Sequence, residues 1–331
     1  MNRKNPKTLI LDQKSIKQLV DIKGAIKAVE EAFKEYGKKR VLMPAKIYVH
    51  LDKYKGDFRA MPGYIEKLDK CVLKWVNVHP ANKKLGLPAV MAINILSDPR
   101  SGFPLCIMDA TYATSLRTGA AGAVAAKYLA RSDSRVVGMI GCGVQAQTQL
   151  AGILELFKIK EVKVWDRSPA ATKKFIKSMK RTNLSLTVAK TVKECVGKSD
   201  IVITTTPSRK PLLKLKWLKK DTHINAIGAD AQGKQELDID ILKKAKVVVD
   251  AWEQAAHSGE INVGIKKKML SKKDIYADIG EIVSGKSEGR SNKDEITVFD
   301  STGLAIQDVA IANFIYKAAL KKKIGKKIKI I

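Results

Sequence analysis

The chain has 331 residues, of which 45% are hydrophobic and 29% are charged. This length allows two domains of ordinary size, and the composition is that of a globular protein rather than a disordered one. The formal net charge of +29 is high enough for nucleic-acid binding. The lysines are spread over the whole chain, however, and no zinc-finger spacing or aromatic RNA-binding signature accompanies them. We interpret the charge as a lysine-rich solvated surface and expect no specific nucleic-acid partner.

Membrane insertion, secretion and metal binding are not indicated either. No stretch approaches the roughly 18 to 20 apolar residues of a membrane helix, and the first ten residues lack the apolar core of a signal peptide. Cys71, Cys106, Cys142 and Cys195 lie far apart without a CxxC pair. We expect a cytoplasmic protein with reduced thiols, no metal ion and no membrane partner.

The first third of the chain opens with an amphipathic helix and then changes to strands. Apolar residues recur at helical spacing from Ile22 to Tyr36, with Asp21 placed to cap the start and Gly37 to end the helix. The segments that follow are predicted strands at 46–51, 72–78, 89–95 and 105–108, a turn at 97–102, and a long helix at 109–130 rich in alanine and glycine.

Strands and helices alternate from Val136 onward. The predicted strands are 136–140, 162–165, 201–205, 223–227, 247–250 and 296–299, and the predicted helices are 145–157, 170–179 and a final 305–319 before a lysine-rich tail. Such alternation predicts a parallel doubly wound sheet. The expected fold class is α/β: a Rossmann-type doubly wound domain of residues 117–303 is inserted in a discontinuous α+β domain of residues 1–116 and 304–331.

A glycine-rich turn follows the strand 136–140 and opens a helix. Its sequence is Gly141-Cys142-Gly143-Val144-Gln145-Ala146. Gly141 permits the tight turn, Gly143 lets the backbone approach a pyrophosphate, and Ala146 stands where the third glycine of the dinucleotide fingerprint packs against the strand. The N-terminus of the helix offers free N–H donors and the positive end of its dipole to the pyrophosphate.

An acidic residue follows at the expected distance. Asp166 ends the next strand, 20 residues beyond Ala146, where a carboxylate hydrogen-bonds the adenosine ribose. This favours NAD over NADP. Arg167 directly after it weakens the preference, because an arginine can accept a 2′-phosphate. A helix cap or turn is the structural alternative for Asp166.

Three segments before the glycine-rich turn carry cations that suit an anionic substrate, namely 43–46, 59–62 and 73–77. Lys74 interrupts an otherwise apolar strand. A lysine on a buried face is costly unless it is paired, and burial lowers its pKa toward the range useful for proton transfer. A strand that turns Lys74 to solvent is the alternative.

The sequence resembles the ornithine cyclodeaminase/mu-crystallin family over essentially its whole length. The matching motifs are Arg59–Pro62, Lys74–Asn77, Asn82, Gly86–Pro88, Asp109–Thr111, Ser115–Ala121, the Gly141–Ala146 turn, Thr204–Ser208, Asn225–Asp230 with Lys234, and Phe299–Gly303. Within the family, the segments His79-Pro80, Thr111–Gly122 and Gly259–Asn262 are similar to those of archaeal alanine dehydrogenases.

The resemblance implies a role for each matching residue. Lys74 and Asp230 are the implied catalytic residues, Lys74 as proton donor and acceptor and Asp230 at the substrate amino group. The implied substrate-binding residues are Lys46, Arg59, Met61, Lys74 and Arg117. The implied cofactor-binding residues are Arg117, Thr118, Gly141, Gly143, Val144, Gln145, Ala146, Asp166, Arg167, Ser168, Thr205, Thr206, Asp230, Lys234, Ser301 and Gly303.

The implied activity is NAD-dependent oxidative deamination of L-alanine to pyruvate and ammonia, with the reverse amination. An ornithine cyclodeaminase or an imine (ketimine) reductase of the same family is the alternative. Arg59 stands where we align the acidic residue with which cyclodeaminases bind the terminal amine, and a cation there repels ornithine. The resemblance also implies a homodimer formed through the discontinuous domain, which would bind the substrate.

Overall fold

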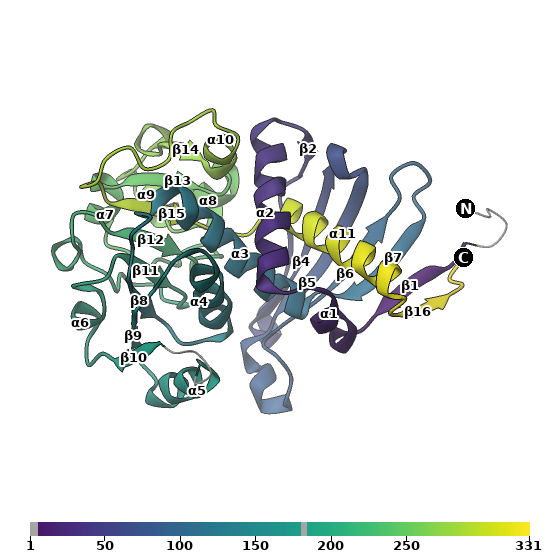
Figure 1. The fold of residues 1–331 in the computed structure, drawn as a ribbon, viewed down its shortest axis with the longest axis horizontal. Coiled ribbons are helices and arrows are strands. Elements are labelled where there is room, and N and C mark those ends of the chain that lie inside the picture. Colours follow the sequence, from purple (N-terminus) through teal and green to yellow (C-terminus); the bar gives the residue numbers. More distant parts are fainter. Residues whose placement is uncertain (1–5, 180–183) are drawn as a thin grey trace. The chain divides into compact units, whose positions relative to one another are not determined.

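The computed structural model describes residues 6–179 and 184–331 and divides into two compact units (Figure 1). Unit 1 comprises Met1–Arg117 and Leu304–Ile331, and unit 2 comprises Thr118–Gly303. Arg117 therefore belongs to unit 1, one residue beyond the boundary expected from the sequence. Its guanidinium contacts Gln307 and Asp308 of the C-terminal helix, which also belong to unit 1.

Unit 1 is built on one mixed sheet in the order β16-β1-β7-β6-β5-β4-β2, with β3 paired to β4. Among the described strands of this sheet, only β1 and β7 are parallel neighbours. Its strands are β1 (Thr8–Leu11), β2 (Val41–Leu42), β3 (Ile47–Leu51), β4 (Gly56–Ile65), β5 (Lys70–Val78), β6 (Val90–Ser97), β7 (Pro104–Asp109) and β16 (Lys326–Ile328). Its helices are α1 (Gln13–Leu19), α2 (Ile22–Gly37), the start of α3 (Thr111–Leu129), α11 (Ala305–Lys322) and the 3-10 turns η1 (Asp52–Tyr54), η2 (Glu66–Leu68) and η3 (Pro80–Leu85).

Helices α2 and α11 pack together, and α11 lies along β4, β5 and β6 (Figure 1). The predicted helix at 22–37 is confirmed, and the Asp21 side chain caps it by accepting a hydrogen bond of 2.8 Å from the Gly24 amide. Val29 and Phe33 on its apolar face are fully buried. Because both helices lie on the same side, the α11 face of the sheet becomes the core of unit 1.

Unit 2 contains one parallel sheet in the order β10-β9-β8-β11-β12-β15-β13-β14. Its strands are β8 (Val136–Ile140), β9 (Glu161–Trp165), β10 (Ser185–Val188), β11 (Ile201–Thr204), β12 (His223–Ala226), β13 (Lys246–Val249), β14 (Ala277–Asp278) and β15 (Thr297–Asp300). Its helices are the rest of α3, α4 (Val144–Leu156), α5 (Pro169–Met179), α6 (Val192–Val196), α7 (Ile239–Lys244), α8 (Trp252–Ser258), α9 (Asn262–Lys266), α10 (Ile279–Val283) and the 3-10 turns η4 (Leu215–Trp217) and η5 (Lys272–Asp274).

Successive residues of the unit 2 strands point to opposite faces of the sheet and belong to two different hydrophobic cores. In β8, Val137 and Met139 join the core under α3, α4 and α5, whereas Ile140 joins the core under α6, α7 and α8. Helices therefore cover both faces, and the strand order reverses between β8 and β11. This is the doubly wound sheet that the sequence predicted, and ligands bind such sheets beyond the carboxyl ends of the strands at the reversal.

Several elements are not predicted from the sequence, of which β4 and β16 matter most. Strand β4 is the longest strand of unit 1, but Gly56, Pro62 and Gly63 conceal it because proline and glycine are unusual inside strands. Strand β16 lies in the lysine-rich tail and pairs antiparallel with β1. Lysines are common on edge strands, where they discourage pairing with other chains. Among the described residues, no helix is both long and apolar enough to cross a membrane.

Candidate active site

In unit 2, the glycine-rich turn joins β8 to α4 at the reversal of the strand order. Gly141 has a φ of +94°, and a Cβ on it would stand 2.8 Å from the Thr205 hydroxyl oxygen. The residue must therefore be glycine for conformational and packing reasons. Gly143 is the N-cap of α4, and a Cβ on it would have no protein atom within 4 Å. Folding does not require a glycine at 143, so the space above it is available to a ligand at the start of α4.

Asp166 at the end of β9 is bound to the same turn. Its carboxylate accepts hydrogen bonds from the Cys142 amide at 2.8 Å and from the Ser168 amide at 2.7 Å. Each carboxylate oxygen has a second lone pair, so the side chain retains capacity for a ribose hydroxyl. The structure thus shows that Asp166 stabilises the turn through backbone amides. Its contact with the cofactor stays a prediction.

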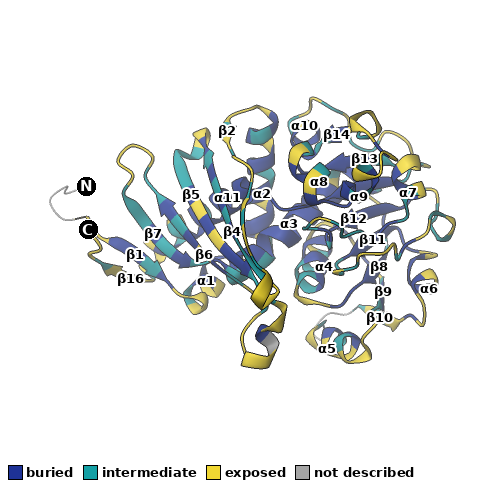
Figure 2. Cartoon of the chain, turned by 180° about the vertical axis from the view of Figure 1, so that it is seen from behind, coloured by how far each residue is buried: buried dark blue, intermediate teal, exposed yellow. Residues whose placement is uncertain are grey.

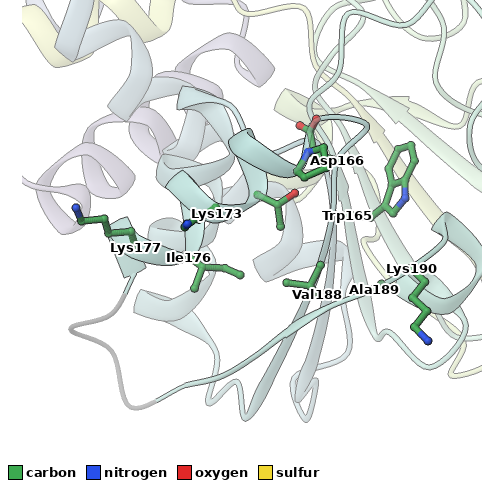
Figure 3. Close-up of a pocket in the computed structure, with 10 residues that line it drawn as sticks. Trp165, Asp166, Lys173, Ile176, Lys177, Val188, Ala189 and Lys190 are labelled. Atoms are coloured by element: carbon green, nitrogen blue, oxygen red, sulfur yellow. The ribbon is translucent and has the colours of Figure 1, made fainter.

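A pocket of about 560 Å³ adjoins Asp166 between α5 and the end of β10 (Figure 3). It is lined by Trp165, Asp166, Pro169, Thr172, Lys173, Ile176, Lys177, Val188, Ala189 and Lys190. Three lysines therefore surround a mostly apolar pocket next to a single carboxylate. This charge adds to that of Arg167, so the surroundings of Asp166 are more cationic than the motif alone indicates.

The other predicted cofactor residues of unit 2 lie mainly on three loops that follow β11, β12 and β15. Thr205 donates a hydrogen bond of 3.2 Å to the Gly141 carbonyl, which connects the β11 loop to the glycine-rich turn. Asp230, beyond β12, forms an ion pair with Lys234. Ser301 and Gly303 follow β15, and the Gly303 amide donates to the buried Asp250 carboxylate at 2.6 Å. Since the strands are parallel, all three loops stand at the same edge of the sheet.

The remaining predicted contacts of unit 2 lie along α3 and α4. Ala146 is fully buried, as expected for the position that packs on the strand, whereas Val144 is 67% exposed. Thr118 is buried in α3, and its carbonyl accepts a hydrogen bond of 2.7 Å from the Gln149 side chain. Gln145 lies in the first turn of α4 beside Val144.

In unit 1, Lys74 points into the core, so the alternative of a solvent-facing lysine is wrong. Its side chain is 1% exposed, and its ammonium lies 2.8 Å from a carboxylate oxygen of Asp308 on α11. The other oxygen of Asp308 is 3.4 Å from Arg117 Nε, while Arg117 Nη1 donates to Gln307 at 2.8 Å. Two cations therefore share one buried carboxylate.

The pKa of Lys74 is lowered to about 7 from an ordinary value of 10.5. Burial is the largest cause, because an ammonium loses its hydration in the core, and the positive charge of Arg117 is the next. Asp308 opposes both by stabilising the ammonium, whereas Lys46 adds a smaller repulsion. At neutral pH the side chain can therefore both donate and accept a proton.

Strand pairing brings other predicted substrate residues to the same face of the sheet. Met61 on β4 is paired with Lys74 on β5, and the electrostatic influence of Lys46 on Lys74 places the two cations in range of each other. Arg59 is buried two residues from Met61, and its guanidinium lies 2.7 Å from Asp57 and over the ring of Tyr48. Asp57 compensates part of its charge, so Arg59 repels a cationic substrate less than the sequence suggested.

Asp308, Glu236 and Asp250 are residues that sequence reasoning missed. Asp308 interrupts the apolar run of α11 in the same way that Lys74 interrupts β5, so the same criterion would have found it. Glu236 and Asp250 gave no such signal, because they lie in polar or strand-end segments. Among residues 6–179 and 184–331, no group of three histidine, cysteine, aspartate or glutamate side chains is arranged to hold a metal ion.

The chain is similar to known proteins along nearly its whole length. The model of the ornithine cyclodeaminase/mu-crystallin family matches residues 6–323. The chain belongs to this family. It is 52% identical to the alanine dehydrogenase of Archaeoglobus fulgidus over 322 residues, which cover 97% of this chain and 98% of that protein.

Two solved structures are similar in fold along nearly the whole chain. An archaeal alanine dehydrogenase dimer with bound NAD has a TM-score of 0.94 and 52% identity, with 98% of this chain and 100% of that chain covered. The Δ1-pyrroline-2-carboxylate reductase of Thermococcus litoralis, in complex with NADH and L-proline, has a TM-score of 0.94 and 37% identity, with 97% and 100% covered.

Proposed function

We propose that the protein is an NAD-dependent alanine dehydrogenase. It converts L-alanine, NAD⁺ and water to pyruvate, ammonium, NADH and a proton, and it catalyses the reverse reaction. The buried cluster of Lys74, Asp308 and Arg117 carries the proposal, because it places a proton carrier of pKa about 7 among cations that attract a carboxylate. The 52% identity to an alanine dehydrogenase supports alanine as the substrate.

Unit 2 supplies the dinucleotide site in this proposal. The open space above Gly143 and the N–H groups that begin α4 suit the pyrophosphate. Asp166 serves the adenosine ribose, and the loops after β11, β12 and β15 serve the nicotinamide half. NAD, when bound, supplies the acceptor for the hydride that leaves the amino-acid α-carbon.

Unit 1 supplies the substrate site. Arg117, Lys46 and Arg59 attract the carboxylate of alanine. Burial, together with the charges of Arg117 and Lys46, keeps the Lys74 pKa low enough for neutral Lys74 to exist at neutral pH. Loss of hydride converts the amine to an iminium, which water attacks. Neutral Lys74 then takes up a proton from that water, and in the amination direction protonated Lys74 returns it. Asp230 is the proposed partner of the substrate amino group.

Reduction of a cyclic imine is the second candidate. The observation that favours it is the equally close fold of a Δ1-pyrroline-2-carboxylate reductase solved with L-proline. Both reactions need a carboxylate clamp and a proton donor, so the Lys74 cluster suits either. They differ in whether the carbon–nitrogen bond is broken.

The test follows NADH absorbance with pyruvate plus ammonium, and in parallel with Δ1-pyrroline-2-carboxylate. The reverse reactions use NAD⁺ with L-alanine and with L-proline. Turnover of pyruvate and L-alanine that collapses in Lys74→Ala supports the proposal. Efficient reduction of the cyclic imine without pyruvate turnover would replace alanine dehydrogenase by the imine reductase.

We also propose that two copies associate through the open face of the unit 1 sheet. This is the face opposite α11, where Trp75 and Ile93 are 42% and 49% exposed on adjacent strands (Figure 2). Phe58 stacks on Trp75 with 5.2 Å between ring centroids, so the apolar surface continues onto β4. Exposed apolar surfaces of this kind mark association sites, and the similar archaeal structure is a dimer.

Trp75→Glu tests this interface because it places a charge in the apolar face. We expect a dimer for the wild type and a monomer for the variant by light scattering after size exclusion. Leu156→Glu, at a similarly exposed apolar position of unit 2, is the matched control and leaves the dimer intact. A dimeric Trp75→Glu protein would place the interface elsewhere.

A further inference from the structure

Glu236 is a buried carboxylate that joins two loops at the carboxyl edge of the unit 2 sheet. The side chain is fully buried. One oxygen accepts hydrogen bonds from the Thr206 amide at 2.6 Å and the Thr206 hydroxyl at 2.7 Å. The other accepts from the Gly228 amide at 2.9 Å. Thr206 follows β11 and Gly228 follows β12, so one carboxylate fixes the spacing of the two loops.

The backbone of Glu236 is fixed by hydrogen bonds to Glu260 and Leu212. The buried carboxylate of Glu260 accepts hydrogen bonds from the Glu236 amide at 2.8 Å and the Leu237 amide at 2.7 Å. The Glu236 carbonyl accepts from the Leu212 amide at 2.7 Å. These hydrogen bonds fix the backbone at Glu236 and Leu237. The carboxylate of Glu236 is therefore a fixed point against which the loops are positioned.

The loop after β12 approaches this fixed point too closely for any side chain. A Cβ on Gly228 would stand 2.5 Å from the nearer Glu236 oxygen and 2.2 Å from the Thr206 carbonyl oxygen. A glycine is thus required at 228 by Glu236 and the β11 loop. Asp230, the proposed partner of the substrate amino group, lies two residues further along the same loop.

The carboxylate cluster is costly, which indicates that it serves more than stability. Burial raises the pKa of Glu236, and burial together with the charge of Glu236 raises the pKa of Glu260 well above its ordinary value. An apolar residue at 236 would avoid the desolvation of a carboxylate. It would also leave the Thr206 and Gly228 amides without this acceptor.

We propose that Glu236 is a positioning residue for the nicotinamide half of the dinucleotide, acting through the loops after β11 and β12. The inference rests on the NAD site proposed above. In a doubly wound sheet the two halves of a dinucleotide lie on opposite sides of the strand reversal. Asp166 stands on the β9 side with the adenosine half, whereas Thr206 and Gly228 stand on the β11 and β12 side. Glu236 should therefore affect one half of the ligand only.

The test compares NADH with ADP, which carries the adenosine half alone, by isothermal titration calorimetry. In Glu236→Gln the amide NH₂ opposes either the Thr206 or the Gly228 amide, which releases one loop. We expect the NADH Kd to rise at least tenfold, about 1.4 kcal/mol, and the ADP Kd to stay within twofold. Glu295→Gln is the matched control: Glu295 also accepts from two backbone amides, those of Ser291 and Asn292, but precedes β15 at the opposite edge.

The two affinities together decide whether Glu236 positions the nicotinamide half of the dinucleotide. Equal weakening of NADH and ADP, or no weakening of either, overturns the proposal for Glu236. If the wild type binds neither ligand, the NAD site itself is wrong, which separates the two failures. Should Glu236→Gln not fold, Glu236→Asp serves instead. It keeps the charge but withdraws the oxygens by one methylene, and it must show the same selective loss of NADH affinity.

Discussion

Replacing Lys74 with methionine changes how the stability of the protein depends on pH. Methionine has a similar length, so the packing of the core is largely kept while the buried ammonium is removed. In the wild type, burial and Arg117 lower the Lys74 pKa from 10.5 to about 7. The folded protein therefore holds fewer protons than the unfolded chain between these two pH values. It follows that the free energy of unfolding rises with pH in this window.

The size of the effect comes from the same two pKa values. The contribution of Lys74 to the free energy of unfolding is highest above pH 10.5. It decreases as the pH falls to about 7 and does not change at lower pH. The full difference of 3.5 pKa units (10.5 minus 7) corresponds to about 5 kcal/mol. Integration between pH 7 and 9 gives about 2 kcal/mol, because Lys74 is half protonated in the folded state at the start of that interval.

Urea unfolding of the wild type and Lys74→Met at pH 7 and pH 9 measures this contribution as a double difference, in which the ionisations of groups outside the Lys74 cluster cancel. We expect the wild type to gain about 2 kcal/mol more than the variant as the pH rises. Lys27→Met, which removes an exposed lysine of α2, should follow the wild type. Parallel changes in the wild type and Lys74→Met would refute the reasoning, since the buried ammonium would then not be desolvated. We also expect Lys74→Met to lower alanine turnover by about a hundredfold or more, because it removes the proton carrier.

Two further changes test the dinucleotide site of unit 2. Gly143→Ala should raise the NADH Kd about tenfold or more while leaving the melting temperature unchanged, because the added Cβ meets no protein atom within 4 Å; unchanged affinity in a fluorescence titration would show that no pyrophosphate lies there. Asp166→Ala should raise the ratio of NADP to NAD efficiency in kcat/KM at least about tenfold. It removes the carboxylate that repels a 2′-phosphate and leaves the next residue, Arg167, and the pocket lysines Lys173 and Lys190. A ratio that does not move would mean that Asp166 acts only through the Cys142 and Ser168 amides.

Local patterns made much of unit 2 predictable. The strand, the glycine-rich turn and the helix from Val136 to Leu156 are contiguous in sequence, and Gly141 meets a local conformational demand of the turn. Lys74 was also recognisable, because a charge within an apolar strand demands an explanation. The carboxylate that pairs with it could not be assigned, since only the sheet topology brings α11 onto β5. Glu236 remained hidden for a similar reason, because only the fold brings it to Thr206, which lies 30 residues away in sequence.

The division of unit 1 between the two ends of the chain has a consequence for its synthesis. Strand β16 pairs with β1, and α11 covers β4, β5 and β6. All of unit 2 leaves the ribosome before α11 does, and domains generally fold in the order of their synthesis. Until α11 arrives, Lys74 has no carboxylate and the strands around it have no helix to cover them. The residues translated after unit 2 therefore close the core of unit 1 and complete its ionic cluster, so a chain that stops before α11 can carry a folded unit 2 without an assembled substrate site.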